Sequence, residues 1–117
     1  MKIFEVFKIL KADAQVLNLL ADRIYEDLAP DGTPTPYLIW IEVSGAADNN
    51  LDGGAVADHL ELQFMIYDPL QVTASSIRSE VCRVLENHGY VNDRLGHHEP
   101  ATKLFARGFS MSLWLNR

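Results

Sequence analysis

The sequence predicts an α+β fold, in which an antiparallel sheet with a long hairpin packs against an N-terminal helix and one long central helix. Three observations support this prediction. Residues 2–22 have apolar positions three and four apart, as in a helix, whereas residues 37–44 and 58–67 alternate with a period of two. A well-formed helix start then falls at residues 68–71. At 117 residues the chain is expected to be one domain, 1–117.

An amphipathic stripe predicts the N-terminal helix. Its members alternate in spacing between four and three residues: Ile3, Phe7, Leu10, Ala14, Leu17, Ala21 and Ile24. Asp13 is suited to cap a second short helix after a break near Lys11 and Ala12, so residues 2–22 form either one bent helix or two. Residues 28–36 contain three prolines and Gly32, which excludes both helix and central strand.

Two alternating segments predict the hairpin. In residues 37–44 one face is wholly apolar (Tyr37, Ile39, Ile41, Val43), while the other mixes Leu38 and Trp40 with Glu42 and Ser44. In residues 58–67 the apolar positions Leu60, Leu62, Phe64 and Ile66 point one way. The residues between, 45–54, are rich in Ala, Asn, Asp and Gly and are predicted to be a long loop. The connection is too short for a parallel crossover, so the strands are expected to be antiparallel.

The central helix has the best-formed start signal. Asp68 is placed to cap, Pro69 suits the first helical position, and Gln71 completes a capping box, with Tyr67 and Val72 at the staple positions. The helix is expected to bury Leu70, Ala74, Ile77, Val81, Val84 and Leu85, with His88 as a further candidate, and to stop at Gly89. Beyond it the sequence predicts a short strand at 90–95, a loop at 97–100 and a last strand from Phe105 to Leu115.

Charge and composition exclude several function classes. The net charge of −6 lies wholly in residues 1–58, which carry 10 acidic and 4 basic groups, whereas residues 59–117 carry 6 of each. An acidic chain with no basic cluster argues against sequence-specific binding of nucleic acid. The single cysteine, Cys82, excludes an intrachain disulfide and a cysteine-based zinc site. No apolar run approaches the ~20 residues of a membrane span, and Lys8 and Lys11 interrupt any signal peptide, so a soluble domain made in the cytosol is expected.

Two segments invite a metal interpretation. Residues 48–53 match the first half of a calcium-binding EF-hand loop, but its twelfth position falls on His59 and its flanks are predicted strands. Adjacent His97 and His98 are not expected to converge on one metal ion. Without a nucleophile motif, the sequence predicts no catalytic residue, metal or cofactor. The alternative from a different class is a small metal-assisted hydrolase that uses Asp48 and Asp52 with His59 or with the His97–His98 pair.

The order of several short segments carries a family resemblance. They are Arg23-Ile24-Tyr25 after the first helix, Leu28-Ala29-Pro30, Gly32 to Pro34, Pro36-Tyr37 at a strand start, Leu51-Asp52-Gly53, the strand 60–67, the long helix and the strand 108–115. Over nearly its full length the chain resembles the small tail-completion, or tail-terminator-like, proteins of long-tailed bacteriophages and prophages.

The resemblance implies a structural protein of virion assembly and no enzyme. Such a protein caps or completes the tail tube, helps join the tail to the head, and assembles as a six-fold ring. The implied partners are the chain itself as a homo-hexamer, the tail tube protein and the head–tail connector proteins. The implied location is the virion tail or neck, with assembly in the cytoplasm of the bacterial host. A different neck or tail-tube component is the nearest alternative.

Two sets of residues are the candidate binding sites. Loop 45–56, with Asp48, Asn49, Asn50, Leu51, Asp52 and Gly53, is long and polar, and we expect it to become ordered only on a partner. Leu38, Trp40 and Trp114 are candidate subunit contacts if they lie outside the core, because tryptophan is enriched at interface hot spots. The alternative is that a helix layer and a loop cover the two faces. In a ring around DNA, the acidic half 1–58 is expected to supply more of the lumen than the half 59–117.

Overall fold

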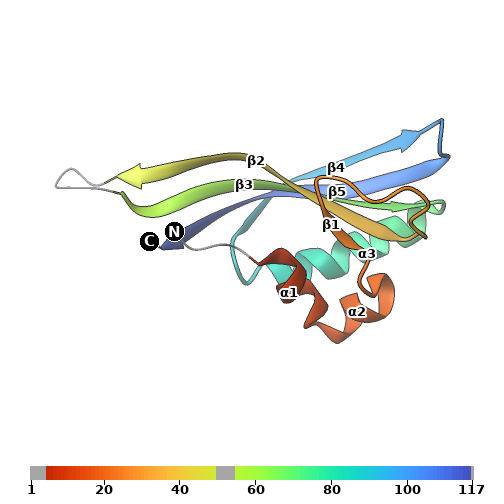
Figure 1. Cartoon of the computed structure of the whole chain (residues 1–117), viewed down its shortest axis with the longest axis horizontal. Coiled ribbons are helices and arrows are strands. Elements are labelled where there is room, and N and C mark those ends of the chain that lie inside the picture. Colours follow the sequence, from red (N-terminus) through yellow and green to blue (C-terminus); the bar gives the residue numbers. More distant parts are fainter. Residues whose placement is uncertain (1–4, 50–54, 117) are drawn as a thin grey trace.

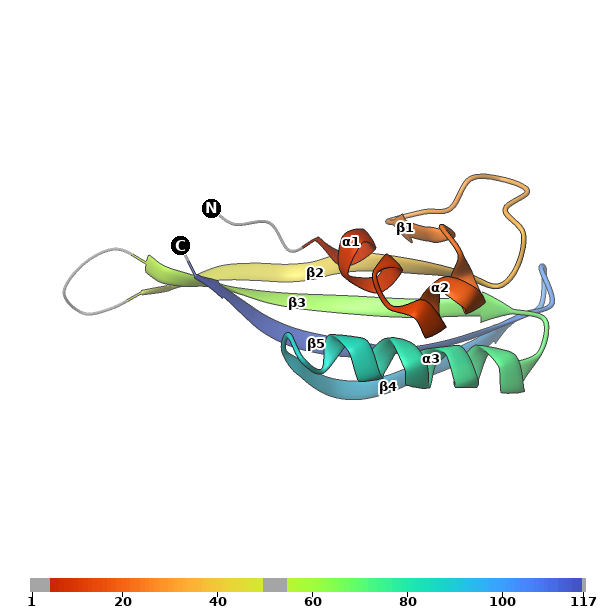
Figure 2. The same ribbon diagram turned by 90° about the horizontal axis from the view of Figure 1, so that it is seen from below.

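In a computed structural model, which describes residues 5–49 and 55–116, a five-stranded sheet carries all three helices of the described chain on one face (Figures 1 and 2). The elements are α1 (Val6–Lys11), α2 (Ala14–Leu20), β1 (Ile24–Glu26), β2 (Tyr37–Asn49), β3 (Ala55–Asp68), α3 (Gln71–Leu85), β4 (Tyr90–Glu99) and β5 (Leu104–Asn116). The strand order is β1-β2-β3-β5-β4. The α+β prediction is confirmed, although the sheet is mixed, because the short strand β1 pairs parallel to β2.

The N-terminal segment forms two helices, as one of the two sequence alternatives has it. The Asp13 carboxylate begins α2 by accepting hydrogen bonds from the backbone N–H groups of Gln15 (3.0 Å) and Val16 (3.1 Å). The break shifts the helical phase, so the predicted stripe is wrong in part: Phe7 and Leu17 are 42% and 40% exposed. The buried positions of the two helices are Val6, Leu10, Val16 and Leu20.

The hairpin is longer than predicted. Residues 45–49 and 55–56 were expected in a loop, but they continue β2 and β3, with Gly45 opposite Leu60 and Ala47 opposite Asp58. The two arms of the hairpin pair with each other along this segment, and β5 pairs with β3 from Ala57 onward, so pairing overrides the weak strand propensity of these residues. An irregularity between Glu42 and Ser44 shifts the register of β2.

The central helix starts later than predicted. It begins at Gln71, and the Asp68 carboxylate accepts the N–H of Leu70 (2.9 Å) in the turn before it. The predicted burial of Leu70 is wrong, since that side chain is 65% exposed, and His88 is also exposed. The other five predicted core positions of the helix are confirmed: Ala74, Ile77, Val81, Val84 and Leu85.

Residues 90–99 form one strand. The sequence predicted a short strand and a loop, but β4 runs along β5 from Tyr90 to Glu99, with a register irregularity between Val91 and Arg94. The loop prediction for His97 to Pro100 is therefore wrong for its first three residues, which pair with β5. The predicted last strand is confirmed as β5.

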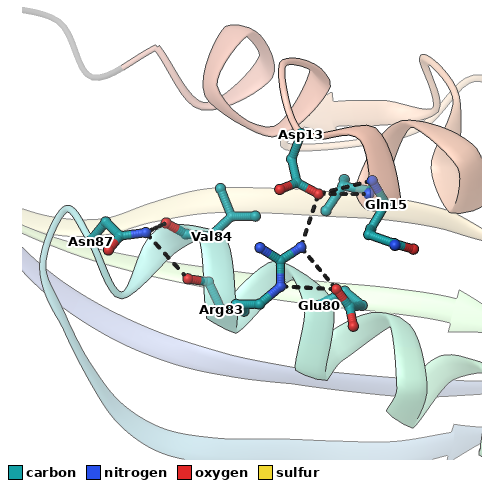
Figure 3. Close-up of polar contacts among 7 residues, drawn as sticks. Asp13, Gln15, Glu80, Arg83, Val84 and Asn87 are labelled. Atoms are coloured by element: carbon teal, nitrogen blue, oxygen red, sulfur yellow. Dashed lines mark hydrogen bonds and ion pairs between the residues drawn. The ribbon is translucent and has the colours of Figure 1, made fainter.

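The core lies between the helices and one face of the sheet. Phe64 of β3 and Phe109 of β5 stack there with ring centroids 5.0 Å apart, and both are fully buried. Arg83 of α3 binds the helix layer together, because its guanidinium contacts the carboxylates of Asp13 and Glu80, each at 2.9 Å (Figure 3). Within the described ranges, none of the helices has the length and apolar character needed to cross a membrane.

Candidate functional site

The sheet face opposite the helices carries no helix (Figure 1) and is apolar along β2. Two rows of paired residues cross it: Tyr37, Tyr67, Ala106 and His97 in one, and Ile39, Met65, Gly108 and Leu95 in the other. The rings of Tyr37 and Tyr67 stack 5.2 Å apart. Tyr37, Ile39, Tyr67 and Leu95 are each half-buried, without a helix above them. We call this surface the open face. It is the first of two candidate contact surfaces on the described part of the chain.

The tyrosines of the open face lie in a partly dry environment. Burial, and then the nearby Glu99 carboxylate, raise the pKa of the Tyr67 phenol above its usual range, and the same two causes raise the pKa of Tyr37. Both phenols therefore remain neutral at physiological pH. Neutral phenols among apolar side chains are suited to contact with another protein surface.

An aromatic cluster extends the open face toward the start of β3 and the end of β5. The indole of Trp114 stacks on the imidazole of His59 at 4.6 Å and meets the ring of Tyr90 edge-on at 5.9 Å. Trp114 is 45% exposed and Tyr90 is 69% exposed. Trp114 therefore lies outside the core, which is the condition that the sequence set for a candidate subunit contact.

The other two candidate contacts occupy different places. Leu38 does not meet the condition, since it is fully buried beneath the helix layer, where it pairs with Ile24 and Ile66. Trp40 is half-buried and packs against the same core, with its ring 6.5 Å from that of Phe64. The mixed face of β2 is thus the inward one, and the wholly apolar face points to the open side.

The candidate binding loop is only partly described. Asp48 and Asn49 belong to β2, where they pair with Ala57 and Ala55 of β3. Asn50, Leu51, Asp52 and Gly53 lie outside the described residues. The binding role predicted for the segment stays a prediction.

The histidines do not converge. His97 and His98 point to opposite faces of β4: His98 packs on the ring of Phe105 at 4.6 Å, whereas His97 Nε2 lies 3.8 Å from a Glu99 oxygen. In the ranges 5–49 and 55–116, no group of three or more His, Cys, Asp or Glu side chains is placed to hold a metal ion.

A polar chain on the open face has the residue types of a hydrolase but not the connectivity. His59 Nε2 lies 2.8 Å from Glu61 Oε1, and the Ser112 hydroxyl donates to the same oxygen. Asn92 in turn donates to Ser112 (2.7 Å). In a Ser–His–carboxylate triad the imidazole accepts the hydrogen bond of the serine hydroxyl, whereas here the Glu61 carboxylate accepts it. These side-chain hydrogen bonds join the strands β3, β4 and β5 on the open face.

The second candidate surface is an arginine-lined hollow that sequence reasoning missed. It has a volume of about 310 Å³ and lies at the β4 edge of the sheet, beside α3. Its lining residues are Arg78, Arg94, Leu95, Gly96, His97, His98 and Arg107. The three arginines come from α3, β4 and β5 and are separated by 13 residues or more in the sequence, so no local basic run signals them.

The thiol of Cys82 lines an adjoining hollow of about 320 Å³ with Arg78, Arg94 and Glu86. Burial, with Glu86 as the next cause, raises the pKa of Cys82 to about 11, so the thiolate is scarce at neutral pH. Cys82 is a half-buried side chain of α3, and its raised pKa makes it a poor nucleophile at neutral pH.

Comparison with known proteins places this fold in a family. The family model described as "Tail completion protein gp17" matches residues 5–106, and the chain belongs to that family of phage tail structural proteins. A chain from a solved structure described as "Virion of native gene transfer agent (GTA) particle" has the same fold, with a TM-score of 0.79 and 12% identity over 96% of this chain and 92% of that one. No curated protein matches the sequence.

Proposed function

We propose that this protein completes the head-proximal end of a phage tail tube and helps join the tail to the head, acting as a ring of six copies. The observation that carries the proposal is the family match over residues 5–106, which spans most of the described chain. The sequence resemblance that implies ring assembly covers the same elements. The proposed partners are further copies of the chain, the tail tube protein and the head–tail connector proteins, with the virion neck or tail as the location.

The open face supports an assembly role. A monomer gains nothing from leaving Tyr37, Ile39 and Leu95 without a covering layer, since half-exposed apolar groups contribute less to stability than buried ones. Apolar surface of this kind usually marks a protein contact. The Trp114 cluster adds an exposed aromatic anchor to the same surface. We assign both to contacts with neighbouring copies or with the tail tube.

The charge distribution supports a role beside DNA. Six copies of a chain of net charge −6 would surround a passing genome with negative charge, which repels phosphate and favours sliding over binding. We place the lumen on the acidic half of the chain, which includes the exposed Glu42 in the middle of β2.

Deletion of the gene and localisation of a tagged chain test the proposal. In the phage or prophage that encodes the chain, deletion of its gene should yield filled heads and separate tails, and expression of the wild-type chain should restore joined virions. Electron microscopy of particles carrying a tagged chain should place the tag at the neck. A tag along the whole tube would favour a tail-tube component instead. Normal virions without the gene would overturn the proposal.

A further inference from the structure

The three arginines of the β4-edge hollow lack acidic partners. Within the described ranges, Arg78, Arg94 and Arg107 form no ion pair with a carboxylate, whereas Arg83 on the same helix as Arg78 pairs with two. The guanidinium of Arg78 donates to the Leu95 carbonyl (3.3 Å). That of Arg107 donates to the carbonyls of Ala106 (2.9 Å) and His97 (3.3 Å). These bonds hold the groups in place while leaving most of their donors unused.

The positive charges of Arg94 and Arg107 repel that of Arg78. Burial, and then the charges of Arg94 and Arg107, lower the pKa of Arg78, which remains fully protonated at any physiological pH. The acidic groups near the hollow are few: Glu86 lines the adjoining hollow, Asp93 is exposed on the same strand, and Glu99 lies beside His97. An anionic group entering the hollow would relieve the repulsion among the three guanidinium groups.

The opposite edge of the sheet has the complementary charge. Four exposed carboxylates surround β1 and the turn after it: Asp22, Glu26, Asp27 and Asp31. Within the described chain, none of the four forms an ion pair with a basic side chain. The nearby Arg23 donates instead to the backbone carbonyls of Pro36 (2.7 Å) and Leu19 (3.4 Å). We call these four residues the acidic edge.

The strand order determines what these two surfaces can contact. In the order β1-β2-β3-β5-β4, the acidic edge and the arginine hollow lie at opposite edges of one sheet, so they cannot meet within a molecule. Two successive copies placed edge to edge bring them together. A contact between two different surfaces of the same chain repeats from copy to copy and closes into a ring when the rotation allows it.

We infer that the arginine hollow of one copy receives the acidic edge of the next copy, as a head-to-tail subunit contact. The inference rests on the proposed ring, which it deepens by naming the surfaces that meet. It also accounts for the uneven charge of the chain, since the acidic half supplies one side of the contact and the balanced half supplies the arginines. The remaining acidic groups of residues 1–58 stay available to the lumen. Duplex DNA is the competing occupant, and the test below includes it.

Neutralising variants of each edge test the contact. The hollow variant carries Arg78→Ala and Arg94→Ala, and the edge variant carries Asp22→Asn and Glu26→Gln. In sedimentation velocity at low salt, each should associate at least about tenfold more weakly than the wild type. Two matched controls change the same number of exposed charges elsewhere, Lys8→Ala with Lys11→Ala and Glu5→Gln with Glu42→Gln, and should associate as the wild type does.

Mixing the two variants gives the decisive readout. The edge variant retains its hollow and the hollow variant retains its acidic edge, so an equimolar mixture should form one-to-one heterodimers and nothing larger. Melting curves monitor folding, and the single variant Arg94→Ala, at an exposed side chain, replaces the double variant if that fails to fold. Unchanged association of the variants, a mixture that remains monomeric, or a wild-type chain that stays monomeric at high concentration and low salt would each overturn the inference.

The same variants separate this inference from its alternatives. If duplex DNA binds the wild type and loses affinity for the hollow variant while self-association is unchanged, the hollow is a phosphate site and the inference is wrong. If the hollow variant and the edge variant both associate as the wild type does, and a tagged chain still locates to the neck, the inference is wrong and the proposed function stands. If the tag is absent from the neck, the proposed function falls whatever the edges do.

Discussion

The two faces of the sheet use apolar residues for different ends. On the helix-covered face, Phe64, Ile66 and Phe109 are fully buried, and their contacts stabilise the monomer. On the open face, Tyr37, Ile39 and Ile41 alternate just as regularly along β2 but remain half-buried. The same local pattern therefore serves folding on one side and leaves surface for a partner on the other. Four sets of substitutions test this contrast.

Truncation in the covered face should have the largest effect. Phe109→Ala removes a fully buried ring that stacks on Phe64, and we expect the free energy of unfolding to fall by about 3–5 kcal/mol. Ile41→Ala on the open face should cost about 1 kcal/mol, since that side chain is only half-buried. Urea unfolding of both variants gives the comparison. Equal losses would show that the open face is as closely packed as the core.

A glycine of the open face should be nearly as sensitive. A Cβ at Gly108 would lie 1.7 Å from the Phe64 carbonyl oxygen and 2.5 Å from Met65 Sδ, so Gly108→Ala should destabilise the chain by about 1–3 kcal/mol. Gly96→Ala is the control, because its Cβ would meet chiefly the flexible Arg107 side chain, at 3.2 Å, and should cost less than about 1 kcal/mol. Chemical unfolding measures both. A harmless Gly108→Ala would mean that β3 and β5 separate there at little cost.

The helix layer itself depends on a cap and a charge. The Arg83 contact is the first cause that lowers the pKa of Asp13, so the ionised carboxylate stabilises the fold above its ordinary pKa of 3.8 and loses that effect as the pH falls through the lowered value. Asp13→Asn keeps a capping side chain but loses the ion pair, and should lower the melting temperature at pH 7 less than Asp13→Ala does.

The difference in melting temperature between the wild type and Asp13→Asn should shrink as the pH falls through the lowered pKa of Asp13, below 3.8. A difference that stays constant with pH would remove the ion pair as its cause. Melting curves at a series of acidic pH values give this comparison.

The smallest change in stability is expected at the exposed aromatic cluster. Trp114→Ala should alter the free energy of unfolding by less than about 1 kcal/mol, since 45% of the side chain faces solvent. If the open face contacts another copy, the same variant should weaken self-association by about tenfold, as expected for an aromatic hot spot. Chemical unfolding and sedimentation velocity separate the two quantities. A large loss of stability with intact association would make Trp114 a folding residue.

The sequence predicted most elements but misplaced several of their ends. The Asp13 cap, the β2–β3 pairing and five core positions of α3 follow from local rules of capping and periodicity. The ends of the hairpin do not follow from such rules, because residues 45–49 are held in the sheet by pairing with β3 and not by their own strand propensity. The same holds for β4, whose pairing with β5 overrides a turn-like composition around Gly96.

The candidate sites divide in the same way. Trp114 was identified from its residue type and its strand position, and it lies on the surface. Leu38 was misjudged because both faces of β2 are apolar enough to be buried, so alternation alone does not tell which one faces the helices. The arginine hollow had no signal at all, because its side chains come from three elements that only the folded sheet brings together.

By itself, the sequence determined the α+β class, the periodic core positions and the confinement of the net charge to residues 1–58, since each depends on composition or on neighbours within a few residues. The tertiary structure alone decided which sheet face lies under the helices and which two strands form the edges. Those outcomes depend on pairing between distant segments. Pairing is also what puts unpartnered arginines at one edge and unpartnered carboxylates at the other.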